Sequence, residues 1–406
     1  MAIIRPVQTE PPRIVRLVVV TRAGELLGAL PPYPVTTPWW QDTGAVIQGA
    51  RERFGITVTI LRILATELPA PHGGGVTYLV EAEAPPPPGV EPWRGALDDH
   101  PLRQPWARPG GPSDDLAWAD SVLRARGLSR TAPAEQIRSW NLSSVWRLRA
   151  EGQTFWLKHV PPFFGHEGAL IARLAGGPVP ALLGHDGRRI LMPELPGEDL
   201  YHAELPILER LVSLLVGLQR DASRRVDEFL ALGLPDFRGA ALTRLIADAV
   251  ERTPELSAGD RATLDGFVDG LPGRFRRLAE AGLPDTLVHG DFHPGNARGD
   301  ATSVALLDWG DSGVGHPLLD QPAFLTRVPP GAVGPLRSLW GRAWRAAVPG
   351  SDPERAAELL APVAAARQAV IYRTFLDGIE PSEHPYHARD VLEWLERTAE
   401  MVHSRA

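Results

Sequence analysis

Two carboxylates and an amide lie close together in the stretch TLVHGDFHPGNARGDATSVALLDWGDSGVGHPLLD. Asp291 and Asn296 lie in a loop that follows a short apolar strand, and Asp308 ends the next apolar strand. The turn RGDATS between them predicts a hairpin or strand pair that brings the three side chains to one end. Mg²⁺ takes carboxylate and amide oxygens together with waters and phosphate oxygens. The pattern therefore indicates a magnesium–phosphate site.

Two other interpretations of this stretch stay open at the level of single residues. Asp, Asn, His and Gly are common in turns that have no chemical role. The pattern HGDFH at residues 289–293 also has the form of a metal-dependent hydrolase site, which needs further histidines at other strand ends. His166, His185 and His316 follow glycines but lack that context.

The complete string resembles the signature of the aminoglycoside phosphotransferase and choline kinase family. HGDFHPGN and then LLDWGDSGVGHPLLD contain every fixed position of HGDxxxxN, a strand ending in Asp-Trp, and GxPxxD. With the region upstream, the resemblance covers residues 131–400. It implies that Asp291 is the catalytic base, which accepts the proton of an acceptor hydroxyl or orients it. It also implies that Asn296 and Asp308 hold Mg²⁺, and that His289 and Asp320 support the loop.

The chain has 42 Lys plus Arg residues, but Lys158 is its only lysine. In kinase-type sites, a lysine on a central strand of the small lobe binds the α- and β-phosphates and pairs with a glutamate on the next helix. By the resemblance, these residues are Lys158 and Glu167. A compact ammonium group fits between phosphate oxygens and a carboxylate where a planar guanidinium does not. We therefore expect that Lys158→Arg severely impairs turnover.

The segment SWNLSSVWRL stands where a protein kinase has its glycine-rich phosphate loop, and it contains no glycine. Asn141, Ser143 and Ser144 are the residues expected to supply donors to the phosphates. The segment LMPELPGEDLY resembles the hinge between lobes, with the backbone of Glu194 and Leu195 facing the adenine edge. A plain connector fits the same segment. The resemblance implies ATP or GTP as co-substrate, with Mg²⁺, and does not decide between the two nucleotides.

The positions of strands and helices predict an α+β chain. These positions predict a small α/β domain, then a β-rich lobe and then a larger helical lobe. The resemblance implies that the last two are the small and large lobes of a bilobal, protein-kinase-like fold. A helix is expected from Ser113, as its N-cap, to Gly127, and a stiff polyproline segment at residues 84–93. The expected divisions are an N-terminal domain at 1–93, a linker with a helix at 94–130, the small lobe at 131–194 and the large lobe at 195–406.

The N-terminal segment PWWQDTGAVIQGARERFGITV resembles a degenerate Nudix box. Glu52 and Gly55 match that pattern, whereas Gln48, Gly49 and Arg53 replace its arginine and two of its acids. A diphosphate hydrolase needs several carboxylates around Mg²⁺, so the resemblance implies an inactive domain that serves as a cap, a dimerisation surface or a substrate sensor. An unrelated small α+β domain fits the same segment.

Composition excludes several classes of protein. The net charge is −7 with a pI of about 6.0, which argues against a broad basic surface for nucleic acid. The absence of cysteine excludes disulfides and thiolate metal sites. No apolar run is long enough to cross a bilayer, and the chain start does not resemble a signal peptide, so we expect a cytoplasmic protein without a membrane partner.

The acceptor is the least defined part of the prediction. The C-terminal stretch carries Glu380, Glu383, His384, Tyr386, His387 and Asp390, and its carboxylates suit a cationic acceptor such as an aminoglycoside or an amino alcohol. The same acids are also typical of the solvated face of a terminal helix. The sequence therefore predicts a Mg²⁺-dependent small-molecule O-phosphotransferase that acts on an antibiotic, sugar or amino-alcohol hydroxyl. The alternative is a weakly active pseudokinase that binds nucleotide as a regulatory module, and any homo-oligomer is expected to form through the N-terminal domain.

Overall fold

The computed structural model describes residues 12–69, 71–82, 89–300 and 302–404. Contacts group the chain into two units. Unit 1 contains residues up to Pro162, with Leu183–Glu194 and Phe375–Ala388, and unit 2 contains Phe163–Leu182, Leu195–Thr374 and the C-terminal residues from Arg389. One boundary between the two units falls between Glu194 and Leu195. No helix in the described ranges is long and apolar enough to span a membrane.

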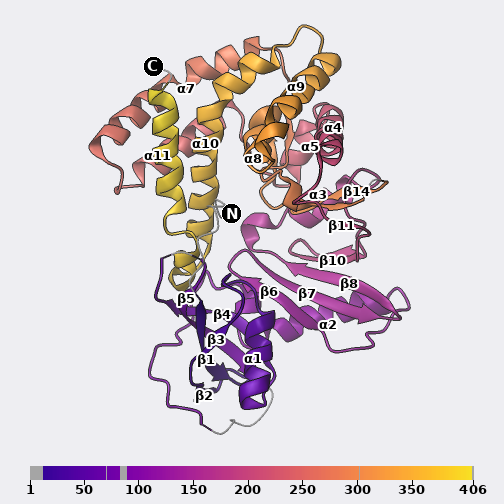
Figure 1. Cartoon of the computed structure of the whole chain (residues 1–406), viewed down its shortest axis with the longest axis vertical. Helices are drawn as coiled ribbons and strands as arrows, with labels where there is room; N and C mark the ends of the chain where they lie inside the picture. The colour runs from indigo at the N-terminus through magenta and orange to yellow at the C-terminus, as the bar shows by residue number, and fades with distance from the viewer. Residues whose placement is uncertain (1–11, 70, 83–88, 301, 405–406) are drawn as a thin grey trace. The chain divides into compact units, whose positions relative to one another are not determined.

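The N-terminal part of unit 1 is a mixed five-stranded sheet in the order β2-β1-β5-β4, with β3 also paired to β1. Strand β1 runs parallel to β5, whereas its pairings with β2 and β3, and that of β4 with β5, are antiparallel. The bounds are β1 (Arg13–Val20), β2 (Leu26–Ala29), β3 (Tyr33–Val35), β4 (Val58–Thr66) and β5 (Gly74–Ala82). Helix α1 (Gly44–Phe54) buries Val46 and Ala50 against one face of this sheet (Figure 1). Helix α1 and the five strands β1 to β5 therefore pack together as one small domain.

The second sheet of unit 1 is antiparallel and has the order β6-β7-β8-β10-β9. Its strands are β6 (Glu135–Trp140), β7 (Ser143–Ala150), β8 (Gln153–His159), β9 (Gly184–His185) and β10 (Arg189–Pro193). Alternation in the sequence TFWLKH places Phe155 and Leu157 in a core with Ala119 and Leu123 of α2 (Gly111–Arg124). Helix α2 follows a 3₁₀ turn, η1 (Pro105–Ala107).

Two sequence predictions about the region before this sheet are corrected or fall outside the described residues. Helix α2 begins at Gly111 with Gly110 as its N-cap, not at Ser113, because Pro112 occupies the first turn, where its missing N–H costs nothing. Most of the polyproline run, residues 83–88, lies outside the described ranges.

The two sheets of unit 1 are joined by a side chain. Gln136 of β6 accepts a hydrogen bond from the Ile60 N–H of β4 at 2.8 Å and donates one to the Ile60 carbonyl, also at 2.8 Å. Strand β4 has a bulge between Ile60 and Arg62, so the amide of Gln136 takes the place of a neighbouring backbone. The N-terminal domain is thereby attached to the edge of the second sheet.

Unit 2 is mainly helical. Its helices are α3 (Glu167–Arg173), α4 (Leu205–Ala222), α5 (Val226–Ala231), α6 (Gly239–Glu251), α7 (Ala258–Glu280), α8 (Gln321–Leu325), α9 (Pro330–Ala347), α10 (Pro353–Gly378, whose last turn belongs to unit 1) and α11 (Asp390–His403). Its small sheets contain β11 (Glu198–Asp199), β13 (Ala297–Gly299) and β14 (Val304–Leu306) in one, and β12 (Thr286–Val288) and β15 (Gly313–Gly315) in the other. Short 3₁₀ turns are η2 (Pro162–Phe164), η3 (Pro294–Asn296), η4 (Pro317–Asp320) and η5 (Pro381–Tyr386, in unit 1).

Candidate active site

The loop with the HGDFHPGN sequence leaves the buried strand β12, which pairs with β15 rather than with the strand before Asp308. The turn depends on Gly290, which has φ 91°, and a Cβ at this position would lie 1.9 Å from the carbonyl oxygen of Asp311. Glycine is needed here for both its conformation and its small size. The chain therefore turns sharply just before Asp291.

Asp291 is held by two residues of its own loop. Asn296 Nδ2 donates to the Asp291 carbonyl at 2.9 Å and to its carboxylate Oδ2 at 3.1 Å. His293 Nε2 lies 3.5 Å from the same Oδ2. Burial alone would raise the pKa of Asp291, but the hydrogen bond and charge of His293, together with Arg327, outweigh it and lower the pKa below the usual range. Asp291 is therefore a fixed, ionised carboxylate at neutral pH.

The hairpin of β13 and β14 brings Asp308 to Asn296. Ala297 lies opposite Leu306 in the antiparallel pair, and the Leu307 N–H donates to the Asn296 carbonyl at 2.8 Å. Asp308 is the next residue, so it lies at the end of the hairpin where Asn296 lies. The predicted meeting of Asp291, Asn296 and Asp308 at one end therefore follows from this register, although the first strand of the predicted pair is β13 and not β12.

The backbone of Asp308 has φ 62°, in the left-handed region. Within the described ranges, the only other non-glycine residue with positive φ is Glu151. Aspartate tolerates this conformation better than most residues, but it still costs free energy, and such costs are concentrated at functional sites. The conformation indicates that the direction of the Asp308 side chain matters for the function of the site.

These residues fit a magnesium ion that is held largely by phosphate oxygens. Asn296 uses its amide nitrogen on Asp291, which leaves its side-chain oxygen for a metal, and Asp308 supplies a carboxylate. No group of three or more His, Cys, Asp or Glu in the described ranges could enclose a metal ion. Mg²⁺ is commonly bound by one or two protein oxygens plus waters and substrate phosphates, so the donor set matches that mode rather than an all-protein cage.

Asp320 anchors the start of the loop that carries Asp291. Its two carboxylate oxygens accept the N–H groups of His289 (2.9 Å) and Gly290 (2.8 Å), and Gln219 Nε2 donates to Oδ2 at 2.9 Å. Burial raises the pKa of Asp320 to about 6 against the effect of these N–H groups. One side chain thus satisfies two buried backbone donors next to Asp291.

His289 links the loop to the strand that precedes Asp308. Its Nε2 lies 3.0 Å from the Leu307 carbonyl, to which it donates, and its ring packs against Trp309 with centroids 4.3 Å apart. Burial lowers the pKa of His289 to about 4, so the ring is neutral at physiological pH. A neutral, fully enclosed ring suits a positioning role and not proton transfer.

Two residues near the loop have no counterpart in the sequence prediction. Arg367 of α10 is buried and donates to the Gly290 carbonyl at 3.2 Å and the Asp311 carbonyl at 3.0 Å. Burial, and then the charges of Asp291 and Asp308, raise the pKa of Asp311 to about 7. A helical arginine gives no sequence signal for this contact. The LLDWGD string offered a weak signal for Asp311, because it places a third acid three residues after Asp308.

The predicted phosphate-binding residues belong to different units. Lys158 of β8 pairs with Val145 of β7 and Ile190 of β10, so it lies on a central strand, on the sheet face opposite Leu157 and α2. Glu167 begins α3 in unit 2, where it is buried and accepts the Trp309 N–H at 3.2 Å. The pairing of Lys158 with Glu167 stays a prediction.

The three residues expected to contact phosphates through a loop are all buried in unit 1. Asn141 Nδ2 donates to the Glu383 carbonyl at 3.3 Å, and Asn141 Oδ1 lies 3.2 Å from His387 Nε2. The hydroxyls of Ser143 and Ser144 accept from the indole N–H groups of Trp140 and Trp146, each at 3.0 Å. The side chain of Asn141 is therefore engaged inside the unit, and backbone N–H groups are the better candidates for phosphate contact at this turn.

The predicted hinge residues already have backbone partners. The Glu194 N–H donates to the Thr154 carbonyl at 2.9 Å, which extends the pairing of β8 and β10. The Leu195 carbonyl accepts from Arg298 Nε at 3.1 Å within unit 2. Contact of these backbones with adenine stays a prediction.

The acidic C-terminal stretch is not the solvated helix face that its composition suggested. Glu380 and Glu383 are both buried in unit 1. Glu380 binds Arg103 at 2.8 Å and lies 3.7 Å from Arg62, and Glu383 Oε1 accepts the Ile63 N–H at 2.8 Å. Because both carboxylates are used within unit 1, they do not form a surface for a cationic acceptor. His387 is buried as well, rather than at the surface.

We predict that Asp320→Ala lowers the free energy of unfolding by about 3–5 kcal/mol, because it leaves the His289 and Gly290 N–H groups buried without an acceptor. Chemical denaturation measures this loss. Asp221→Ala is the matched control. Among the residues that the structure describes, the exposed Asp221 carboxylate bonds to its neighbour Arg220 alone, so its removal should change stability by less than about 0.5 kcal/mol. Equal stability of the two variants would contradict the anchoring role.

Comparison with known proteins identifies the family and the fold of the chain. The family model described as the phosphotransferase enzyme family matches residues 133–359. No curated protein matches the chain. A solved structure of an aminoglycoside phosphotransferase homologue from Ralstonia eutropha is 18% identical with a TM-score of 0.50, and the match covers 72% of this chain and 98% of that one.

Two further solved structures match at similar levels. The macrolide 2'-phosphotransferase MphH from Brachybacterium faecium is 19% identical with a TM-score of 0.49, covering 68% of this chain and 98% of that one. A choline/ethanolamine kinase family protein from Mesorhizobium loti is 15% identical with a TM-score of 0.46, covering 71% and 99%. Identities this low establish the fold alone, and the predicted α+β, protein-kinase-like fold is confirmed. Because the family model matches more than half of the chain, the resemblance drawn from the signature residues is confirmed and this chain belongs to the phosphotransferase enzyme family.

Proposed function

We propose that the protein transfers the γ-phosphoryl group of ATP or GTP to a hydroxyl of a small molecule, with Mg²⁺. The observation that carries the proposal is the β13–β14 hairpin, whose register brings Asn296 and Asp308 together while Asn296 also binds Asp291. A carboxylate that can orient a hydroxyl thus lies beside two oxygen donors suited to a phosphate-bound metal ion.

Each residue has a distinct part in this proposal. Asp291 accepts a hydrogen bond from the acceptor hydroxyl and orients its oxygen towards the γ-phosphorus. Asn296 and Asp308 would hold Mg²⁺, which supplies charge neutralisation on the phosphates when it is bound. Lys158 binds the α- and β-phosphates, and Glu167 orients Lys158. His289 and Asp320 hold the loop and do not take part in proton transfer.

The acceptor is a hydroxyl compound of the antibiotic, sugar or amino-alcohol classes. The burial of Glu380 and Glu383 removes the main argument for a strongly cationic acceptor, so neutral sugars deserve equal weight in the search.

The test is a screen of hydroxyl acceptors with the full chain. A coupled assay of ADP or GDP release measures the turnover of ATP or GTP. We expect turnover above background with one acceptor class, and a loss of at least about 100-fold in kcat for Asp291→Asn with nucleotide binding retained. Asn keeps an oxygen for the bond from Asn296 but loses the charge. Nucleotide binding without transfer to any acceptor would favour a regulatory pseudokinase, and absence of Mg²⁺-dependent nucleotide binding would contradict both functions.

Lys158→Arg provides a second prediction. The charge is kept, but a planar guanidinium replaces a compact ammonium group, so we expect kcat/KM to fall by at least about tenfold while the melting temperature stays close to that of the wild type. Arg147→Lys, on the neighbouring strand β7, is the matched control for an exchange between the two cations and should retain turnover. Wild-type turnover in Lys158→Arg would refute the argument from the single lysine.

A further inference from the structure

The β6–β7 turn of unit 1 is in contact with residues 375–388, which are distant from it in sequence. We propose that the N-terminal domain and residues 375–388 together fix this turn, and that Asn141 is the positioning residue through which they do so. The functional meaning rests on the proposed function, in which this turn covers the phosphates of the nucleotide. The N-terminal domain then supports the sheet whose turn covers the nucleotide.

Residues 375–388 form part of the core of the N-terminal domain. Tyr386 is buried in the same apolar cluster as Val15, Tyr78 and Val80. Its ring contacts Trp40 of the N-terminal domain and Trp140 at the end of β6, each with centroids 5.6 Å apart in an edge-to-face arrangement. One aromatic side chain therefore joins the N-terminal core to the residue that begins the turn.

Polar contacts secure the same segment to the N-terminal domain. Glu383 Oε1 accepts the Ile63 N–H of β4, and burial raises the pKa of Glu383 to about 8, so the group is largely neutral at physiological pH. The Glu380 carboxylate accepts hydrogen bonds from two nitrogens of Arg103, at 3.1 and 2.8 Å. Gln104 Nε2 donates to the Gly378 carbonyl at 3.2 Å.

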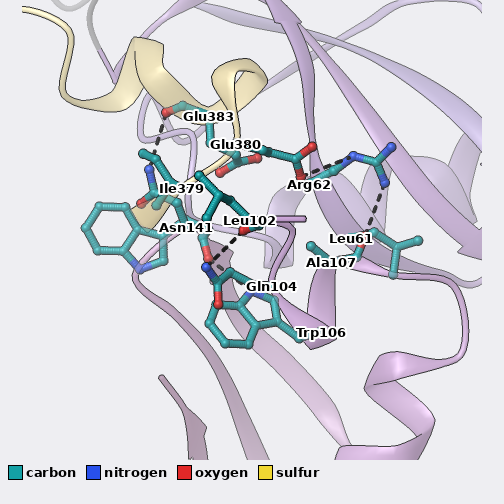
Figure 2. A pocket seen from close by; sticks show the side chains of 11 residues that line it. Leu61, Arg62, Leu102, Gln104, Trp106, Ala107, Asn141, Ile379, Glu380 and Glu383 are labelled. Carbon is teal, nitrogen blue, oxygen red and sulfur yellow. Dashed lines mark hydrogen bonds and ion pairs between the residues drawn. The ribbon is translucent and has the colours of Figure 1, made fainter. Parts of the chain in front are cut away.

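Figure 2 shows a small cavity beside these contacts. It is lined by Leu61, Arg62, Leu102, Gln104, Trp106, Ala107, Trp140, Asn141, Ile379, Glu380 and Glu383. Its volume is about 10 Å³, which is enough for no more than one water molecule. The contact region between the N-terminal domain, residues 375–388 and the turn is therefore closely packed.

Asn141 connects this contact region to the turn through both the nitrogen and the oxygen of its side-chain amide. Its nitrogen donates to the Glu383 carbonyl and its oxygen lies next to His387 Nε2, as dashed lines in Figure 2 show for the Glu383 contact. Trp106 Nε1 donates to the Trp140 carbonyl at 3.0 Å and fixes the preceding residue as well.

The turn itself needs no glycine. Trp140 pairs with Ser143, so Asn141 and Leu142 form a two-residue connection, and neither has a positive φ. A glycine-rich loop obtains its close approach to phosphates from backbone freedom. Here an ordinary turn is instead held in one conformation by contacts on the side of the N-terminal domain. Such preorganisation lowers the entropy that nucleotide binding must overcome.

The test compares Asn141→Ala and Tyr386→Ala with Tyr386→Phe in the full chain. The Tyr386 hydroxyl has no hydrogen-bond partner among the described residues, so its removal is a matched control that keeps the ring. Hydrogen exchange of the amides at residues 141–144 reports the turn without any nucleotide. Steady-state kinetics separates KM for the nucleotide from kcat, and the nucleotide Kd replaces KM if no acceptor has been found.

We expect both alanine variants to raise the exchange rate of these amides about tenfold and KM for the nucleotide by about three- to tenfold, with kcat changed by less than about twofold. Tyr386→Phe should match the wild type in both. Unchanged exchange in the alanine variants would overturn the positioning role, and so would faster exchange with an unchanged KM or Kd. A wild-type chain that binds no nucleotide would instead contradict the proposed function, and exchange alone would then decide whether the turn is held as inferred.

Discussion

The pair of hydrogen bonds from the His289 and Gly290 N–H groups to the Asp320 carboxylate is the constraint on which the site depends. Both donors lie in buried backbone immediately before Asp291, and an unsatisfied buried N–H would cost about 1–3 kcal/mol. Arg367 and His289 complete the arrangement by binding the Gly290 and Leu307 carbonyls. The loop that carries Asp291 and the strand that leads to Asp308 are thereby fixed to each other before any ligand binds, which is the preorganisation that phosphoryl transfer requires.

The N-terminal domain is attached to the β6–β10 sheet by similar physics. The Gln136 amide satisfies both backbone groups of Ile60 at a bulge, and Tyr386 joins the aromatic residues on either side. In a glycine-rich loop, the backbone freedom of glycine allows the close approach to phosphates. Here, contacts from neighbouring elements hold the turn in place instead. A domain without the acids of a diphosphate hydrolase can still affect nucleotide affinity through this route.

The sequence predicted the local parts of the site well. The short apolar runs around HGDFHPGN and VALLDW, with a polar turn between them, indicated that Asp291, Asn296 and Asp308 meet. The family resemblance indicated a central strand for Lys158. The predictions that failed concern contacts between residues far apart in the chain. Strand β12 pairs with β15, and Glu380 and Glu383 pack beside Arg62 and Ile63, more than 300 positions earlier. Neither pairing leaves a periodic or spacing signal, because each depends on how complete elements pack.

The proposed function requires that Lys158, in unit 1, and Asp308, in unit 2, act on the same nucleotide–Mg²⁺ complex. A double-mutant cycle on binding of a non-hydrolysable ATP or GTP analogue, measured by calorimetry with and without Mg²⁺, tests it most directly. Lys158→Ala and Asp308→Asn should each weaken binding in the presence of Mg²⁺, and their combined loss should differ from the sum of the single losses by at least about 0.5 kcal/mol. Strictly additive losses, or binding unaffected by Lys158→Ala, would contradict the account.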